Sequence, residues 1–140
     1  MNMARHARSG FTLIEILIVV AIMGALMGFF FGIVPRVTRA FNTYKVNATI
    51  SEVKSGLTQY QLSVGKYPQK LKDLIKPPKD ETERKKWKRA GGPFLQELPI
   101  DPWGNKYVYK LTPGGKHPYE LYSYGSQGPG SPKDDWITAW

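Results

Sequence analysis

The chain has 140 residues, a formal net charge of +9, two histidines and no cysteine. This length is enough for one small domain, and the absence of cysteine excludes both a disulfide framework and a thiol nucleophile. Neither His6 nor His117 has the serine and acid spacing of a catalytic triad, so we predict that the protein is not an enzyme.

The first ten residues, MNMARHARSG, have the composition of a targeting leader. They contain Arg5 and Arg8, lack acidic residues and end in small residues, and an apolar stretch follows them. An A-x-A-like cleavage site is missing after that stretch. The pattern predicts either an uncleaved anchor or a cut before the stretch, after Gly10, which would create a new α-amine on Phe11.

Residues 11–34 form an apolar run of 24 residues in which Glu15 is the only ionisable side chain. A helix of this length spans about 36 Å, enough to cross a hydrocarbon core of ~30 Å. We therefore predict a membrane-spanning helix over residues 11–35. A glutamate in such a run is functional by default and needs a partner. That partner is another chain, a lipid headgroup or a group other than a side chain; the Phe11 amine of a neighbouring subunit would make the buried charge tolerable.

Several motifs resemble those of type IV pilins and pseudopilins. The stretch GFTLIEILIVVAIMG at residues 10–24 resembles the leader junction and helix of this superfamily, and GKYP at 65–68 resembles the end of its long helix. LPIDPWGN at 98–105 and the tail after Ser123 resemble the major pseudopilins of type II secretion. The resemblance implies cleavage after Gly10 by a prepilin peptidase and N-methylation of Phe11.

The resemblance also implies a structural role. Subunits would sit in the inner membrane by a single span, with most of the chain in the periplasm, and stack into a homo-oligomeric filament that drives export of folded proteins across the outer membrane. The implied partners are minor pseudopilins, the prepilin peptidase, an inner-membrane platform with its ATPase, and an outer-membrane secretin. Nucleic acid is not an expected partner. The alternatives are a type IV pilin for DNA uptake or adhesion and a monomeric anchored binding module.

Three glycines at every fourth position, Gly24, Gly28 and Gly32, precede Pro35. Such spacing permits close approach of helices in lipid, although glycine is common in membrane helices in general. Proline removes a backbone donor from a helix. Two hypotheses remain open for this segment: packing between subunits, or the unwinding between Gly24 and Pro35 on assembly that the resemblance implies.

Beyond the membrane run, apolar residues recur at intervals of three and four, which is typical of an amphipathic helix with one face in a core. Gly65 and Pro68 end this pattern. We predict one helix over residues 11–64 and an α+β, pilin-like fold with a globular domain over 36–140. The main apolar stripe comprises Val46, Ile50, Val53, Leu57, Tyr60 and Val64, and a second comprises Val37, Phe41, Tyr44 and Ala48.

Residues 69–76 fit a short helix with its leucines and Ile75 facing inward. The surrounding segment 66–90 contains ten Lys or Arg and four Asp or Glu. A charge run of this kind is usually a solvated face; the alternative is a contact for an acidic partner, such as a neighbouring subunit, anionic lipid or DNA. Trp87 within it could stack on a base or cap the core.

From Phe94 onward the pattern indicates β structure. Residues 107–111 and 119–122 alternate and are aromatic-rich, and 112–118 supply a turn. We predict an antiparallel pair of strands resting on the long helix, because two strands alone are marginal in water. The DPWGN stretch should form a tight turn that presents Trp103 to the core.

The loop after Ser123 raises the question of a metal. Major pseudopilins, which this chain resembles, bind calcium there through loop carbonyls and acids. Asp134 and Asp135 match the acidic pair, whereas Gln127 stands where the pattern has an aspartate. Calcium prefers six to eight oxygen ligands, including several carboxylates. The alternative to a calcium site is a loop held by Trp136, Trp140 and backbone hydrogen bonds.

Overall fold

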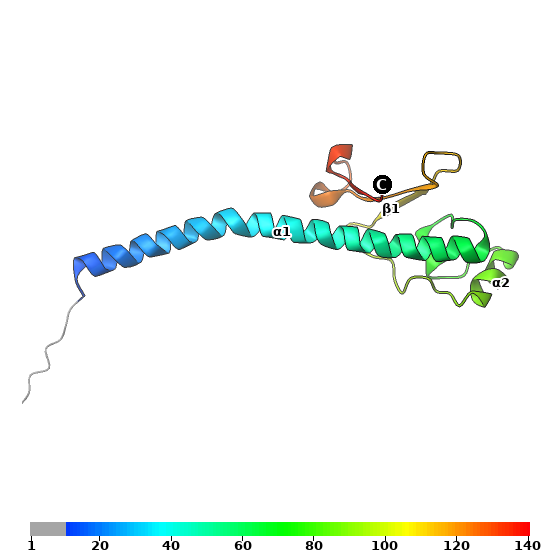
Figure 1. Ribbon diagram of the computed structural model, residues 1–140, viewed down its shortest axis with the longest axis horizontal. Coiled ribbons are helices and arrows are strands. Elements are labelled where there is room, and N and C mark those ends of the chain that lie inside the picture. The colour runs from blue at the N-terminus through cyan, green and yellow to red at the C-terminus, as the bar shows by residue number, and fades with distance from the viewer. Residues whose placement is uncertain (1–10) are drawn as a thin grey trace, which may run out of the picture. The chain divides into compact units, whose positions relative to one another are not determined.

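The computed structural model describes residues 11–140 (Figure 1). The chain divides into two compact units, one ending at Arg39 and the other spanning Ala40–Trp140. Helix α1, Leu13–Val64, contributes to both units. The predicted leader, with its cleavage residue Gly10, lies outside the described residues, and the predicted membrane boundary at residue 35 stays a prediction.

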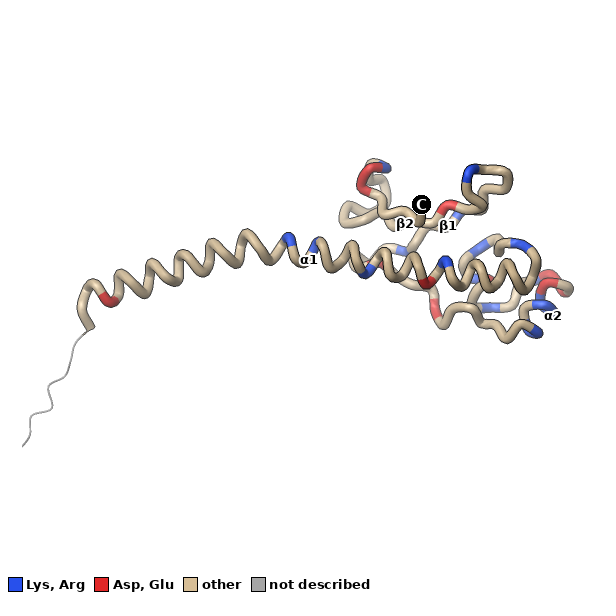
Figure 2. The backbone as a smooth tube through the Cα atoms, in the orientation of Figure 1, with Lys and Arg blue, Asp and Glu red and all other residues tan. Residues whose placement is uncertain are grey.

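The first stretch of α1 presents apolar side chains to its surroundings. α1 is long and apolar enough to cross a membrane, and none of its most apolar 18-residue window is buried within the chain. In α1, Glu15 is the only charged residue before Arg36, and Figure 2 shows one acidic band near the start of this helix. This matches the predicted apolar run with a single ionisable residue.

The helix continues through Pro35. The Thr38 hydroxyl donates to the Val34 carbonyl at 2.9 Å, one turn earlier. A Cβ added at Gly24, Gly28 or Gly32 would meet nothing within 4 Å, so no contact within the single chain requires glycine at these positions. Their packing, or an unwinding of this segment, is a prediction about the assembled state.

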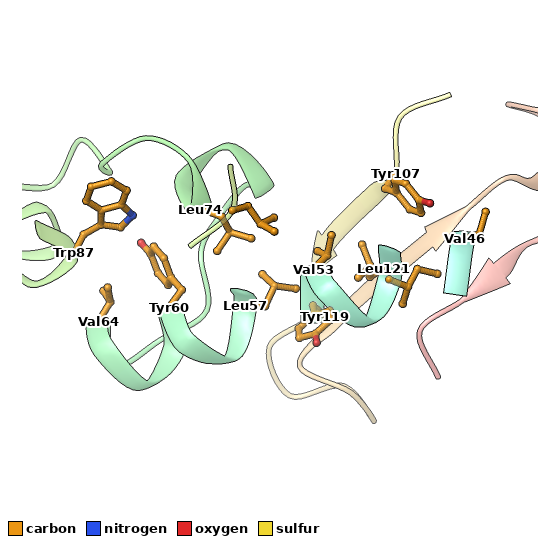
Figure 3. Close-up of a cluster of buried hydrophobic side chains, with 12 residues drawn as sticks. Val46, Val53, Leu57, Tyr60, Val64, Leu74, Trp87, Tyr107, Tyr119 and Leu121 are labelled. Carbon is orange, nitrogen blue, oxygen red and sulfur yellow. The ribbon is translucent and has the colours of Figure 1, made fainter. Parts of the chain in front are cut away.

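The second stretch of α1 carries one side of the core of the Ala40–Trp140 unit (Figure 3). Every residue of the predicted main stripe is at most 4% exposed, which confirms the amphipathic helix. The second stripe behaves differently: Phe41 and Tyr44 are 63% and 72% exposed. Those two side chains therefore remain available for contacts outside the unit.

A three-stranded antiparallel sheet completes this core, in the order β1-β2-β3. β1 is Val108–Leu111, β2 is Tyr119–Ser123 and β3 is Ile137–Thr138. Val108 pairs with Tyr122, and Ser123 pairs with Ile137. The predicted strand pair and the α+β class are confirmed, whereas the predictions did not include β3.

Two short helices connect α1 to the sheet. The 3₁₀ helix η1, Leu71–Leu74, buries Leu74 completely, in agreement with the predicted short helix. Helix α2, Glu81–Arg89, lies within the charged segment 66–90, in which the sequence predicted only the short helix over residues 69–76. Its first turn is capped by the Asp80 carboxylate, which accepts from the Glu83 amide at 2.9 Å.

Trp87 is the apolar anchor of α2. Its side chain is 6% exposed, and its Nε1 donates to the Asp73 carbonyl at 2.9 Å. The Trp87 and Phe94 rings pack edge-on, with their centroids 5.9 Å apart. A ring held in this way caps the core and cannot stack on a nucleic-acid base. The structure thus decides between the two roles that the sequence left open for Trp87.

Candidate assembly site and C-terminal loop

The start of α1 is closed by a reciprocal pair of side chains, Thr12 and Glu15. The Thr12 amide donates to Glu15 Oε2 at 3.2 Å and the Thr12 hydroxyl lies 3.4 Å from the same oxygen. In return, the Glu15 amide donates to Thr12 Oγ1 at 3.4 Å. This is a capping box, in which two residues three apart satisfy backbone donors that a helix start leaves free.

The capping box supplies one of the partners that the sequence left open for Glu15, a group other than a side chain. It also places the carboxylate at the positive end of the helix macrodipole, where a negative charge is favoured. Its signature, T-x-x-E at residues 12–15, was readable in the sequence and was not used in the predictions. Among the described residues, Oε1 of Glu15 makes no hydrogen bond.

The surroundings of this carboxylate are apolar and open. Phe11 and Leu13 are 81% and 80% exposed, and Ile14 is 66% exposed. In lipid, a carboxylate with one free oxygen on such a surface has a strong preference for a cationic donor. The arrangement can therefore cap its own helix and accept a second group at the same time.

A second polar site lies in the globular unit, in the predicted DPWGN turn. The Gly104 amide donates to the Asp101 carbonyl at 3.0 Å, which closes the turn. Asp101 is only 4% exposed, and its Oδ1 accepts the amides of Trp103 and Asn105 at 3.1 and 2.7 Å. Trp103 packs against the core, as predicted.

Asp101 also ties this turn to the C-terminal loop. Its Oδ2 accepts the Ser123 hydroxyl at 2.7 Å, and Ser123 Oγ in turn accepts the Gly125 amide at 3.1 Å. Ser123 is fully buried. The sequence identified the turn but not the carboxylate as the link between turn and loop.

The residues proposed for calcium lie in this C-terminal loop, residues 123–140. Gln127 Nε2 donates to Asp135 Oδ2 at 2.9 Å, and the Asp135 side chain is half-buried. Asp134 is exposed. The structure thus brings together Gln127 and Asp135, with the glutamine acting as a donor toward the carboxylate.

Trp136 fills the centre of the same loop. Its ring stacks on Tyr122 with centroids 4.3 Å apart and planes 3° from parallel, and it meets Tyr124 nearly at right angles. Its Nε1 donates to the Ser131 carbonyl at 3.0 Å. The indole therefore has an aromatic partner on one face and a hydrogen bond at its edge.

Trp140 is anchored against α1 and the turn before β2. The His117 ring stacks on the Trp140 ring with centroids 4.4 Å apart, and Lys54 Nζ lies 3.9 Å from the centroid of the Trp140 ring. Lys54 also donates to the Ala139 carbonyl at 3.1 Å. The last residues of the chain are therefore held by both contacts with Lys54 and the stack on His117.

The basic segment 66–90, which contains α2, lies at one end of the globular unit. Figure 2 shows most of the basic bands of this segment there. Its acids serve internal contacts: Glu83 pairs with Lys66 at 2.5 Å and Glu81 pairs with Arg84 at 2.6 Å. Burial, together with the nearby Glu83 charge, raises the pKa of Tyr60, whose hydroxyl lies 3.4 Å from Glu83 Oε2.

Comparison with known proteins gives consistent matches. Residues 33–140 match the family model for type II secretion system protein G, and residues 5–31 match the prokaryotic N-terminal methylation motif. The type II secretion system core protein G of Pseudomonas aeruginosa is 40% identical over 146 residues, covering 99% of each chain. The protein of the same name from Vibrio cholerae is 34% identical over 127 residues, covering 86% of this chain and 82% of that one.

A solved structure is similar as well. The crystal structure of the major pseudopilin from the type 2 secretion system of enterohaemorrhagic Escherichia coli aligns with a TM-score of 0.62 at 27% identity. The alignment covers 77% of this chain and 93% of that one.

Proposed function

Because the chain belongs to the type II secretion system protein G family, we propose a mechanism by which its N-terminus directs assembly. The chain is a structural subunit of the type II secretion pseudopilus, with a pilin-like fold. These matches favour secretion over the alternative of a type IV pilin for DNA uptake or adhesion. The family is structural, in agreement with the prediction that the protein is not an enzyme.

The subunit is anchored by the apolar stretch of α1, spans the inner membrane once and holds residues 36–140 in the periplasm. A prepilin peptidase cuts after Gly10, and the new amine of Phe11 is methylated. The match to the N-terminal methylation motif over residues 5–31 supports both steps. Assembly into the pseudopilus then involves the minor pseudopilins, the inner-membrane platform with its ATPase, and the outer-membrane secretin.

The proposal rests on the observation that the two carboxylate oxygens of Glu15 are in different situations. Oε2 caps the helix of its own subunit through the Thr12 amide, at 3.2 Å. Oε1 is left to accept the positively charged Phe11 amine of a neighbouring subunit. Capping and pairing therefore do not compete for one oxygen, and neither has to be broken for the other to form.

The pairing also sets the stagger between neighbouring helices. Phe11 lies two residues before the start of α1 at Leu13, and Glu15 is four residues further along the chain than Phe11, which corresponds to at least about 6 Å along the helix axis. For the Phe11 amine of one subunit to reach Glu15 of the next, the two helices must therefore be shifted along their axes by roughly that distance. Each correctly staggered contact neutralises two charges in lipid, and leaving one such charge unpaired costs on the order of 3 to 5 kcal/mol.

Three substitutions at Glu15 test this mechanism. Glu15→Gln retains an acceptor oxygen that can cap the helix but carries no charge. Glu15→Ala removes both the cap and the charge, whereas Glu15→Asp keeps the charge and shortens its reach. We expect all three variants to be inserted and cleaved, because Gln and Ala remove a charge, which only eases entry into lipid, and Asp adds no charge to those of the natural sequence. We expect Gln and Ala to fail in filament formation and Asp to be intermediate.

The measurements are intact mass for processing and cross-linking between subunits for assembly. If Glu15→Gln forms filaments as well as the natural sequence does, the helix cap alone is sufficient for assembly and the charge-pairing mechanism is wrong. Retention of the leader in every variant would instead place the role of Glu15 in recognition by the peptidase.

A further inference from the structure

We propose that the C-terminal loop, residues 123–140, keeps its fold without calcium, because the Gln127 amide and the Trp136 ring hold the loop together where the resemblance to major pseudopilins implies a calcium site. The inference concerns a site other than the N-terminal assembly site. It therefore stands or falls independently of the mechanism proposed for Glu15.

The charges of the loop fit calcium poorly. Its charged side chains are Lys133, Asp134 and Asp135, which sum to a single negative charge. Calcium sites use several carboxylates among six to eight oxygens, and fewer charges weaken the site. Here the position that carries an acid in the pattern carries Gln127, which donates an N–H to Asp135 at 2.9 Å. A cation would have to compete with that N–H for the same carboxylate oxygen.

The backbone of the loop is closed by its own donors. A carbonyl that already accepts a protein hydrogen bond has little to gain by turning toward an ion. Internal donors occupy six carbonyl oxygens of the loop, namely those of Tyr124, Gly125, Gly128, Ser131, Pro132 and Lys133. These six carbonyl groups therefore each have a hydrogen-bond partner within the chain, without a metal.

Trp136 supplies the packing that holds the loop in place. Stacking on Tyr122 at 4.3 Å, with an edge contact to Tyr124 at 5.5 Å, buries aromatic surface between β2 and the returning chain. Aromatic pairs of this geometry contribute beyond the area that they bury. The two bonds of Trp136 Nε1, to the Ser131 carbonyl at 3.0 Å and the Ser131 hydroxyl at 3.1 Å, fix the ring within the loop.

The two ends of the loop also approach closely. A Cβ added at Gly125 would lie 2.6 Å from the Asp135 carbonyl oxygen, so the backbone segments are in direct contact there. Gly125 has a φ of +75°, a conformation that glycine adopts without strain. The Gln127–Asp135 hydrogen bond closes the same pair of segments through their side chains.

The test uses the full chain in detergent micelles, unfolded by heat with either a chelator or millimolar calcium present. A loop with a working calcium site should gain on the order of 10 °C in Tm at a hundredfold excess over Kd. We expect a change of less than about 1 °C for the natural sequence. Terbium, added as a luminescent substitute for calcium, should show no emission sensitised by Trp136.

The diagnostic variant is Gln127→Asp, and Gln96→Asp in another exposed stretch is its matched control. Gln127→Asp removes the donor and sets two carboxylates face to face, which lowers Tm in chelator by roughly 5 °C. Calcium should reverse that loss and terbium should become luminescent. Gln127→Ala should lose a similar part of its stability with no response to calcium, because it lacks both donor and acid.

A calcium-dependent rise in Tm, or sensitised terbium emission, in the natural sequence would overturn the proposal. So would a Gln127→Ala variant as stable as the Gln96→Asp control in chelator, because Gln127 would then not hold the loop.

Discussion

The carboxylate of Asp101 joins the DPWGN turn to the C-terminal loop, and its removal is the most informative perturbation of the globular unit. We consider Asp101→Ala and Asp101→Asn. The side chain is 4% exposed and accepts three hydrogen bonds, from the amides of Trp103 and Asn105 and from the Ser123 hydroxyl. Its loss would leave three donors without an acceptor.

The magnitude follows from the burial of those donors. A buried donor left unsatisfied costs about 1 to 3 kcal/mol. Ser123 is fully buried and cannot turn to water, whereas Trp103 and Asn105 are partly exposed. We therefore expect Asp101→Ala to lose about 3 to 5 kcal/mol, a large share of the roughly 5 to 15 kcal/mol that stabilises a domain. Asp101→Asn keeps the oxygen that serves both amides and removes only the acceptor for Ser123, so about 1 to 2 kcal/mol is expected.

The assay is thermal unfolding of the full chain followed by near-UV circular dichroism, with limited proteolysis of residues 123–140. For a domain of this size each kcal/mol corresponds to a shift of about 4 to 8 °C in Tm. Asp134→Asn is the matched control, because that carboxylate is exposed and should change stability by no more than about 0.5 kcal/mol.

The expected order of stability is the control, then Asp101→Asn, then Asp101→Ala, and the loop should become protease-sensitive in the same order. Unfolding of Asp101→Ala within about 2 °C of the control would refute the reasoning, because the three hydrogen bonds would then contribute no net stability. An unchanged rate of cleavage in the loop would refute the link between turn and loop.

Three further predictions concern the packing of the same unit. Lys54→Met should lower stability by about 1 to 2 kcal/mol, because it removes the cation–π contact with Trp140 and the hydrogen bond to the Ala139 carbonyl. Faster amide hydrogen exchange at β3 would detect this loss. Gly56→Ala should cost about 1 to 3 kcal/mol in thermal unfolding, because the new Cβ would lie 3.0 Å from the Phe94 carbonyl oxygen, a backbone atom that would have to shift to make room. Burial raises the pKa of Tyr119 to about 12, so between pH 10 and 12 the unfolded chain loses the phenolic proton and the folded chain retains it. The free energy of unfolding should therefore fall as pH rises through that window. Tyr119→Phe should make the fall less steep in alkaline titrations.

Much of this protein can be predicted from local patterns. The buried face of α1 repeats every three to four residues, so the stripe from Val46 to Val64 indicated both the helix and the side that packs. The apolar run, with its single acid Glu15, indicated a membrane helix in the same way. The DPWGN turn was equally readable, because an aspartate that bonds the amides following it produces a turn wherever it occurs.

A weaker local signal went unused at two helix starts. Thr12-Leu13-Ile14-Glu15 is a capping box, and Asp80 three residues before Glu83 marks the start of α2. In α2 the charge run hides the helix because only Trp87 is apolar, so no periodicity is visible. The helix forms because that one side chain reaches the core, which is a tertiary fact.

Other features were decided by tertiary structure alone. The strand β3 has two residues, too few for any alternation, and it exists because the chain returns along the edge of β2. The role of Gln127 is similar: the residue can offer either an oxygen or an N–H, and composition does not say which. The choice follows from the position of Asp135, eight residues away, whose carboxylate faces the amide only after the loop has closed around Trp136.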